Sequence, residues 1–214
     1  MSIRVICDRE VASQYSKSGE AQRLLILGKT YVGKSSILLR VNKDKFDPCI
    51  HLTIGANFGP VLEVTIGNGS RTILCTVDIS NESSCTVARF LYKTGIAALV
   101  VYSDSEPGSL EVAKQYIREL EEQEKSDLVI ALVRNKSDLP SDADQASVQE
   151  FATQNGYVFA HVSAKTGQGI EDLFLDIASR LTDKEYGIRQ AKAPEPEHST
   201  EVCLLDRLAP VTGQ

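Results

Sequence analysis

The chain has 214 residues, a formal net charge of −6 and an isoelectric point of about 5.2, and 42% of its residues are hydrophobic. That length suits one α/β domain with short extensions, and the acidic balance argues against a nucleic-acid-binding protein, which needs a basic face. The 5 cysteines lack disulfide or metal-ligand spacing, and neither a membrane-spanning run nor a signal peptide stands out. We therefore expect a cytoplasmic protein with free thiols.

The hydrophobic pattern divides the chain into a central domain and two extensions. Residues 1–21 show no periodicity and are expected to form a flexible N-terminal extension, and periodicity stops again at 182, so 182–214 are expected to be a variable tail. Within the domain, 22–181, strands are predicted at 23–27, 61–66, 71–77, 97–102, 128–133 and 158–162. Helices are predicted at 34–41, 109–123, 144–154 and 169–181.

The order of these elements predicts an α/β fold. The residues Gly67-Asn68-Gly69 between two strand-like runs signal a hairpin, and strands alternate with helices elsewhere. We expect a mostly parallel six-stranded sheet with one antiparallel edge strand and helices on both faces. Ligands bind such sheets at the carboxyl ends of the strands, so functional motifs should converge there.

A phosphate-binding loop is predicted where the first strand of the domain meets the first helix. The segment 28–35 reads GKTYVGKS and fits the pattern G-x-x-x-x-G-K-[ST]. Backbone N–H groups would wrap the phosphates, Lys34 would neutralise the outer ones, and the Ser35 hydroxyl would be a magnesium ligand. The residues expected to contact the nucleotide here are Gly28, Thr30, Tyr31, Val32, Gly33, Lys34, Ser35 and Ser36.

Two later segments favour guanine over adenine. The first, Asn135-Lys136-Ser137-Asp138, follows the strand at 128–133, and its Asp138 carboxylate can accept hydrogen bonds from guanine N1–H and the 2-amino group. The stem of Lys136 can lie on the base. The second, Ser163-Ala164-Lys165, follows the strand at 158–162, and its Ala164 N–H can donate to guanine O6 while Lys165 packs over the base.

These motifs resemble those of the Ras superfamily of small GTPases, and most of all its Rab branch, over residues 22–181. The resemblance implies a P-loop small GTPase fold that binds GTP or GDP with Mg²⁺ and acts as a switch in vesicle trafficking. It implies that Phe46 stacks on guanine and that Thr53 completes the magnesium coordination and grips the γ-phosphate. Asp78 would hold the metal through a water molecule.

The resemblance also implies protein partners. Effector and regulatory proteins would bind the two segments that the nucleotide orders, and the effector surface would include the positions of Phe58, Val77 and Tyr92. Rab proteins carry a tryptophan where Val77 stands, so we expect effector choice to differ. Cys203 lies too far from the end of the sequence for a prenylation signal, so membrane contact is expected only through a partner.

The sequence departs from the family at the segment that follows Asp78. Asn81 stands in place of the glycine whose N–H binds the γ-phosphate, which puts the closure of this segment in doubt. Glu82 stands in place of the glutamine that orients the attacking water, and its charge would repel the triphosphate. With Glu82 at this position, beside Lys34 and Thr53 as the other catalytic residues, we expect slow GTP hydrolysis.

Three functions remain open from the sequence. The first is a slow molecular switch, and the second is a nucleotide-binding scaffold or adaptor without useful hydrolysis. An ATP-using P-loop kinase is disfavoured by Asp138. Tyr31, at a position that is usually small, would lie either over the nucleotide, where it shields the γ-phosphate, or outward in solvent.

Overall fold

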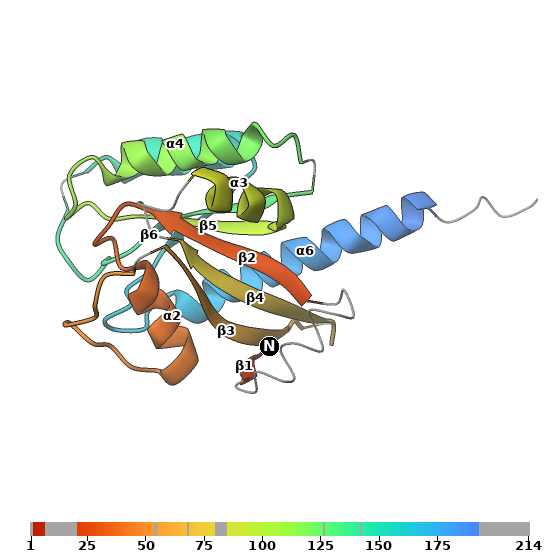
Figure 1. Ribbon diagram of the computed structural model, residues 1–214, viewed down its shortest axis with the longest axis horizontal. Coiled ribbons are helices and arrows are strands. Elements are labelled where there is room, and N and C mark those ends of the chain that lie inside the picture. The colour runs from red at the N-terminus through yellow and green to blue at the C-terminus, as the bar shows by residue number, and fades with distance from the viewer. Residues whose placement is uncertain are drawn as a thin grey trace, which may run out of the picture.

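The computed structural model (Figure 1) describes residues 2–6, 21–53, 55–67, 69–79, 85–125, 127–141 and 143–192. Within these ranges, helices cover both faces of a seven-stranded sheet. The strands are β1 (Ser2–Ile6), β2 (Ala21–Gly28), β3 (Ala56–Thr65), β4 (Arg71–Ile79), β5 (Ala97–Tyr102), β6 (Val129–Arg134) and β7 (Val158–His161). The helices are α2 (Lys34–Lys43), α3 (Cys85–Thr94), α4 (Ser109–Glu121), α5 (Gln145–Gln154) and α6 (Ile170–Lys192).

The sheet is mostly parallel, which confirms the predicted fold class. Its strands lie in the order β1-β3-β4-β2-β5-β6-β7, and β3 is the one described strand that runs against the others. The register places Ile26 of β2 beside Asp78 of β4 and Leu99 of β5. The carboxyl ends of the central strands therefore meet at one edge, and the loops that follow them start side by side.

Two hydrophobic clusters fix the helices to the two faces of the sheet. On one face, α2 and α6 pack on alternate strand residues, and Phe174 of α6 shares a fully buried cluster with Leu24 and Leu99. On the other face, α3, α4 and α5 cover the intervening residues, and Ile117 of α4 shares a cluster with Leu25. Because both faces are buried, the strands read as continuous apolar runs, which is why the sequence located them.

The sheet has seven strands rather than the predicted six, because β1 pairs with β3 in the antiparallel direction. This corrects the prediction that residues 1–21 form a flexible extension. Ile3 and Val5 pack against the cluster beneath α6, while Ser2 and Arg4 are exposed. The alternation of polar and apolar residues that marks a strand is present in the sequence, but it lasts only five residues. The remaining residues of this extension, 7–20, lie outside the described part of the chain.

Two helical segments were not predicted. The helix α3 comes after Asp78 and after the residues in which the sequence departs from the family pattern. Its Leu91 and Tyr92 are buried against the face that carries α4. The helix α6 continues to Lys192, eleven residues beyond the predicted end at 181, so the first part of the predicted tail is helical. Residues 193–214 lie outside the described part. None of the described helices is long and apolar enough to cross a membrane.

Candidate functional site

The loop between β2 and α2 has two glycines that no other residue type could replace without displacing a neighbouring group. Gly28 has φ +143°, and a Cβ atom there would lie 2.2 Å from the carbonyl oxygen of Val101 on β5. Gly33 has φ +93°, and a Cβ atom there would lie 2.3 Å from the side-chain nitrogen of Asn135. The helix α2 begins directly after Gly33 without a side-chain cap, so its first N–H groups remain available to an anion.

Lys34 is a buried cation in this loop. Its Nζ donates to the carbonyl oxygens of Gly28 and Lys29, at 2.9 and 3.1 Å, and the residue is 7% exposed. Burial lowers the pKa of Lys34, and the negative charge of Asp78 partly opposes that shift. An ammonium group held in this way gains strongly from a bound polyanion, because the anion replaces the hydration that burial removed.

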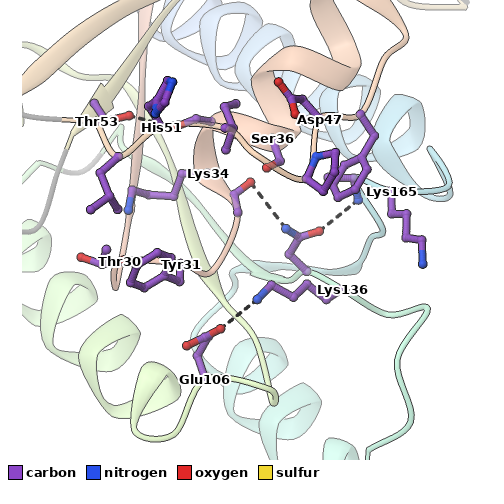
Figure 2. Close-up of a pocket in the computed structure, with 18 of the residues that line it drawn as sticks. Thr30, Tyr31, Lys34, Ser36, Asp47, His51, Thr53, Glu106, Lys136 and Lys165 are labelled. Atoms are coloured by element: carbon purple, nitrogen blue, oxygen red, sulfur yellow. Dashed lines mark hydrogen bonds and ion pairs between the residues drawn. The ribbon is translucent and has the colours of Figure 1, made fainter.

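Tyr31 lies at the rim of the cavity on the same loop (Figure 2). Its side chain is 66% exposed and lines the cavity, so whether it lies over a bound nucleotide or outward in solvent stays a prediction. Its backbone has φ +68°, in the left-handed region that non-glycine residues rarely occupy.

Replacing Tyr31 by glycine should therefore stabilise the protein. The left-handed conformation costs a bulky residue about 1–2 kcal/mol, and the greater freedom of glycine in the unfolded chain offsets about half of that. We expect Tyr31→Gly to raise the free energy of unfolding by about 0.5–1 kcal/mol, measured by urea titration of nucleotide-free protein. Tyr31→Phe, which keeps the backbone strain, is the control and should leave it unchanged.

Asn135 connects this loop to the loop that follows β7. The side chain is buried, donates from Nδ2 to the carbonyl oxygen of Val32 at 2.8 Å, and accepts at Oδ1 from the N–H of Ala164 at 3.1 Å. Its role is thus to join the phosphate loop to the second base-selective segment. Because the Ala164 N–H already donates to Asn135, a base carbonyl at this place would share that donor.

Asp138 is held in place by its neighbours and keeps acceptor capacity for a base. The hydroxyl of Ser163 donates to its Oδ1 at 2.6 Å, and Lys165 Nζ lies 3.9 Å from its Oδ2. The Asp138 side chain is 16% exposed, whereas that of Lys165 is 64% exposed. A carboxylate so fixed suits a ligand with two adjacent N–H donors.

Lys136 is tied to the loop after β5, a feature that the sequence did not reveal. Its Nζ forms an ion pair with Glu106 at 2.9 Å (Figure 2). The same Nζ donates to Ser105 Oγ at 3.2 Å. Lys29 Nζ donates to the carbonyl oxygen of Pro107 in the same loop, at 2.6 Å. The loop after β5 therefore joins the phosphate loop to the first base-selective segment, and no pattern in the sequence pairs these residues in advance.

Three oxygen atoms from different segments meet beside Lys34. Ser35 Oγ and Thr53 Oγ1 lie 2.9 Å apart, and both hydroxyls donate to Asp78 Oδ2, the Thr53 bond being 3.0 Å long. The other carboxylate oxygen, Asp78 Oδ1, is buried and has no hydrogen-bond partner among the described residues. A carboxylate and two hydroxyls are the hard oxygen donors that suit a small divalent cation, and the unpaired Oδ1 has capacity for such a ligand or its water.

These loops enclose a cavity of about 440 Å³. The predicted residues that line it are Thr30, Tyr31, Gly33, Lys34, Ser35, Ser36, Phe46, Thr53, Asn135, Lys136, Asp138, Ala164 and Lys165. Gly28, Val32, Asp78 and Ser163 do not line it and instead support residues that do. The lining residues that sequence reasoning missed include Asp47, His51 and Glu106 (Figure 2). Phe46 is 38% exposed, so its ring is open to a ligand in the cavity.

Two of the predicted residues that matter for hydrolysis, Asn81 and Glu82, lie outside the described residues. Of the predicted effector positions, Phe58 is 71% exposed, but Val77 is fully buried and Tyr92 is 5% exposed. The structure thus corrects the prediction for Val77 and Tyr92. Both face the cluster that α3 and α4 cover, and Val77 comes from a strand inside the sheet.

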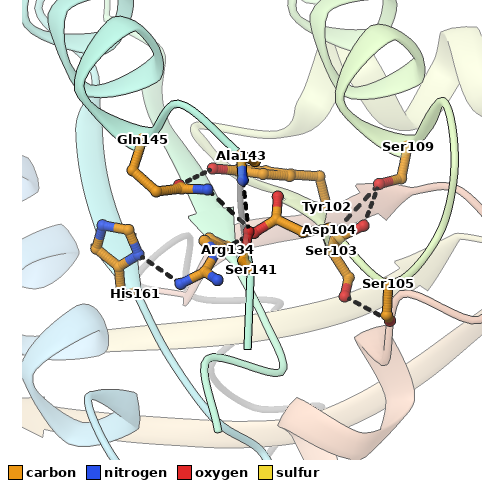
Figure 3. Close-up of polar contacts among 10 residues, drawn as sticks. All are labelled: Tyr102, Ser103, Asp104, Ser105, Ser109, Arg134, Ser141, Ala143, Gln145 and His161. Carbon is orange, nitrogen blue, oxygen red and sulfur yellow. Dashed lines mark hydrogen bonds and ion pairs between the residues drawn. The ribbon is translucent and has the colours of Figure 1, made fainter. Parts of the chain in front are cut away.

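A network of polar side chains joins the loop after β5 to the end of β6, next to the first base-selective segment (Figure 3). Asp104 accepts from Arg134 Nε at 2.5 Å and from Gln145 Nε2 at 3.0 Å, and the Tyr102 hydroxyl donates to Gln145 Oε1 at 3.2 Å. Arg134 directly precedes Asn135, so the network fixes the end of β6. Burial raises the pKa of the Asp104 carboxyl group. Its hydrogen bonds from Ser141, Arg134 and Gln145, together with the charge of Arg134, have a larger effect in the other direction, so the pKa is lowered overall.

The lowered pKa makes the network a source of stability that depends on pH. A carboxyl group whose pKa is lower in the folded than in the unfolded chain stabilises the fold above its unfolded pKa, and this contribution is lost as the pH falls through the folded pKa. We expect Asp104→Asn to cost about 1–2 kcal/mol at pH 7, because the charge-assisted bonds weaken. The difference in Tm between the two proteins should shrink below about pH 4. A difference that is constant down to pH 3 would contradict the assignment.

The fold and the cavity define a P-loop nucleotide-binding protein. The glycine-bounded loop, the buried Lys34 and the oxygen cluster form a phosphate and cation site, and the segments after β6 and β7 form a base site beside it.

Comparisons with known proteins agree with this class. The model of the Ras family matches residues 23–183, and the chain belongs to that family. The chain is 36% identical to GTP-binding protein ypt5 of Schizosaccharomyces pombe, over 75% of this chain and 77% of that protein. It is 36% identical to Ras-related protein Rab-5A of Dictyostelium discoideum, over 74% and 80%, and 34% identical to Ras-related protein RABF2a of Arabidopsis thaliana, over 80% and 86%. Membership implies guanine-nucleotide binding, and the Rab-type relatives confirm the expected branch.

Proposed function

We propose that this protein is a Rab-like GTP-binding switch of vesicle traffic, which binds GTP or GDP with Mg²⁺ and hydrolyses GTP slowly. The observation that carries the proposal is the convergence of the phosphate loop, the Asp138 carboxylate and the oxygen cluster on one cavity. Relatives named as Rab and Ypt proteins support the assignment to vesicle traffic.

Each part of the nucleotide has a residue suited to hold it. Lys34 and the N–H groups after Gly33 would bind the phosphates, and Ser35 and Thr53 would hold Mg²⁺, with Asp78 acting through water. When bound, the metal supplies charge neutralisation between the phosphate oxygens. Asp138 would accept from the guanine N–H groups. Phe46, at the cavity edge, is suited to lie against the base.

Slow hydrolysis follows from Glu82. A carboxylate cannot donate an N–H to a phosphoryl oxygen, and its charge opposes a triphosphate nearby. A loss of about 3 kcal/mol from the transition state slows the chemical step roughly a hundredfold. The same substitution, together with Asn81, favours a second candidate: a nucleotide-holding scaffold or adaptor in which hydrolysis has no role.

Single-turnover hydrolysis of preloaded GTP tests both candidates. Glu82→Gln should hydrolyse GTP faster than the wild type if the carboxylate is what slows the reaction. A wild-type rate that equals that of the variant would contradict the role given to Glu82. Wild-type protein that releases no phosphate over many hours while it keeps its GTP would favour the scaffold.

Protein partners would contact an exposed surface that includes Phe58. Its ring is 71% exposed on β3, next to the segment that carries Thr53, and Phe90 on α3 is 63% exposed. Large exposed aromatic side chains are typical anchors of protein interfaces. We infer that effector recognition depends on Phe58 and not on the side chains of Val77 and Tyr92.

A further inference from the structure

Arg40, near the end of α2, forms hydrogen bonds with two segments that line the cavity or lead to it. Its Nε donates to the carbonyl oxygen of Ala164 at 2.9 Å, and its Nη2 donates to that of Lys165 at 2.6 Å. Its Nη1 donates to both the carbonyl oxygen and the Oδ1 of Asp44, at 3.0 and 2.9 Å. All three nitrogens of the guanidinium group are used, and the side chain is 14% exposed. Arg40 itself does not line the cavity.

The bond to Ala164 fixes the direction of the next N–H group. In a planar trans peptide, the C=O of one residue and the N–H of the next point in opposite directions. Because Arg40 holds the Ala164 carbonyl oxygen on the α2 side, the Lys165 N–H points away from α2. Lys165 lines the cavity, and its N–H has no acceptor among the described residues. The guanidinium group therefore sets the direction of a donor next to the base site.

The hydrogen bond from Arg40 to Lys165 is the first of a series of hydrogen bonds that ends at the Asp138 carboxylate. The N–H that follows the Lys165 carbonyl group belongs to Thr166 and donates to Ser163 Oγ at 3.1 Å. The Ser163 hydroxyl in turn donates to Asp138 Oδ1 at 2.6 Å. Each member has one partner on either side, so a shift of the Lys165 peptide moves the hydroxyl that orients Asp138.

Arg40 also holds the point where the chain leaves α2. Asp44 is the C-cap of that helix and has φ +48°, and the chain continues from it directly to Phe46 at the cavity edge. A guanidinium group can join two segments in this way because its donors form a rigid planar fork, which an ammonium group does not have.

We propose that Arg40 is a positioning residue for base selectivity: it fixes the loop at 163–166, and through Ser163 it orients the Asp138 carboxylate. The inference rests on the proposed guanine site. Base selectivity then depends on a residue outside the cavity, and the same residue holds the start of the segment that carries Phe46 and Thr53.

The test compares binding of GDP with binding of inosine diphosphate, which lacks only the 2-amino group whose N–H would donate to Asp138. Arg40→Lys should raise the Kd for GDP about 30-fold and that for inosine diphosphate by about 10-fold or less, because the 2-amino contact contributes nothing to the second ligand. The ratio of the Kd for inosine diphosphate to the Kd for GDP should therefore fall toward one by roughly threefold or more. Competition against a fluorescent GDP measures both values.

A merely structural role for Arg40 would not move this ratio. Arg180→Lys is the matched control, because Arg180 on α6 also donates from Nη1 to a backbone carbonyl oxygen, that of Gly156 at 2.7 Å, away from the cavity. It should change neither Kd. Arg40→Gln is the second variant should Arg40→Lys not fold, and the same change of ratio is expected from it.

Ser163→Ala removes the hydroxyl that donates to Asp138 and so interrupts the series of hydrogen bonds between Arg40 and that carboxylate. It should lower the preference for GDP by itself, and it should add little to Arg40→Lys, because both act on the same carboxylate. Equal loss of both ligands in the Arg40 variants, or full additivity with Ser163→Ala, would overturn the proposal. Wild-type protein that binds ADP as tightly as GDP would instead overturn the guanine site itself.

Discussion

Lys34→Met is expected to lower the affinity for GDP and GTP about a thousandfold. Lys34 is 7% exposed and donates to two carbonyl oxygens of the phosphate loop, so a bound phosphate would meet a cation with little competing water. Removing one partner of a buried, hydrogen-bonded charge pair costs about 4 kcal/mol, which corresponds to that factor. Equilibrium titration with a fluorescent nucleotide measures the loss.

The fold should survive this change, which separates lost binding from lost structure. Burial lowers the pKa of Lys34, so the folded chain disfavours its charged form despite the opposing charge of Asp78. Methionine fills a similar volume without that cost, and the free energy of unfolding without nucleotide should stay within about 1 kcal/mol of the wild type. Lys43→Met, in the last turn of α2 and outside the cavity, is the control and should keep its affinity. Comparable losses in both variants would contradict a specific role for Lys34.

The phosphate loop and the base-selective segments could be predicted because local chemistry fixes them. The spacing of Gly28, Gly33 and Lys34 defines a loop that only glycines can close, and the structure shows why: a Cβ atom at either glycine would meet a neighbour at 2.2 or 2.3 Å. Asp138 follows a strand buried on both faces, so its place at the carboxyl edge followed from the order of elements.

The supporting contacts could not be predicted, because they join residues far apart in the chain. Arg40 is separated from Ala164 by 124 residues, and Lys136 from Glu106 by 30. Nothing in the local sequence distinguishes Arg40 from any other arginine on a helix. The burial of Val77 was likewise decided by tertiary packing, because Val77 shares its cluster with residues of α3, a helix that was not predicted from the sequence.

Weak local signals explain why β1 and α3 were not predicted from the sequence. A strand of five residues, such as β1, gives too short an alternation to be separated from coil, and its pairing with β3 is a long-range contact. The first residues of α3 include the β-branched Thr86 and Val87, which weaken the helical signal.

Asp138→Asn is expected to invert the base selectivity. Guanine presents two donors side by side, N1–H and the 2-amino group, and a carboxylate accepts both. An asparagine side chain offers one acceptor and one donor, so its amide N–H₂ would face the 2-amino group of guanine and leave a buried donor unpaired. We expect the affinity for GDP to fall at least a hundredfold, or about 3 kcal/mol.

The same variant should gain affinity for xanthosine diphosphate, because xanthine presents an N–H donor beside a carbonyl acceptor and matches the amide. Asp47→Asn is the matched control: Asp47 also lines the cavity, but its Oδ1 accepts from the backbone N–H of Cys49 at 2.8 Å. That variant should keep its preference for GDP. If Asp138→Asn still bound GDP like the wild type, the base would have to lie elsewhere in the cavity. Gain of xanthosine diphosphate binding, in contrast, would place the purine edge against Asp138 without any structure of the complex.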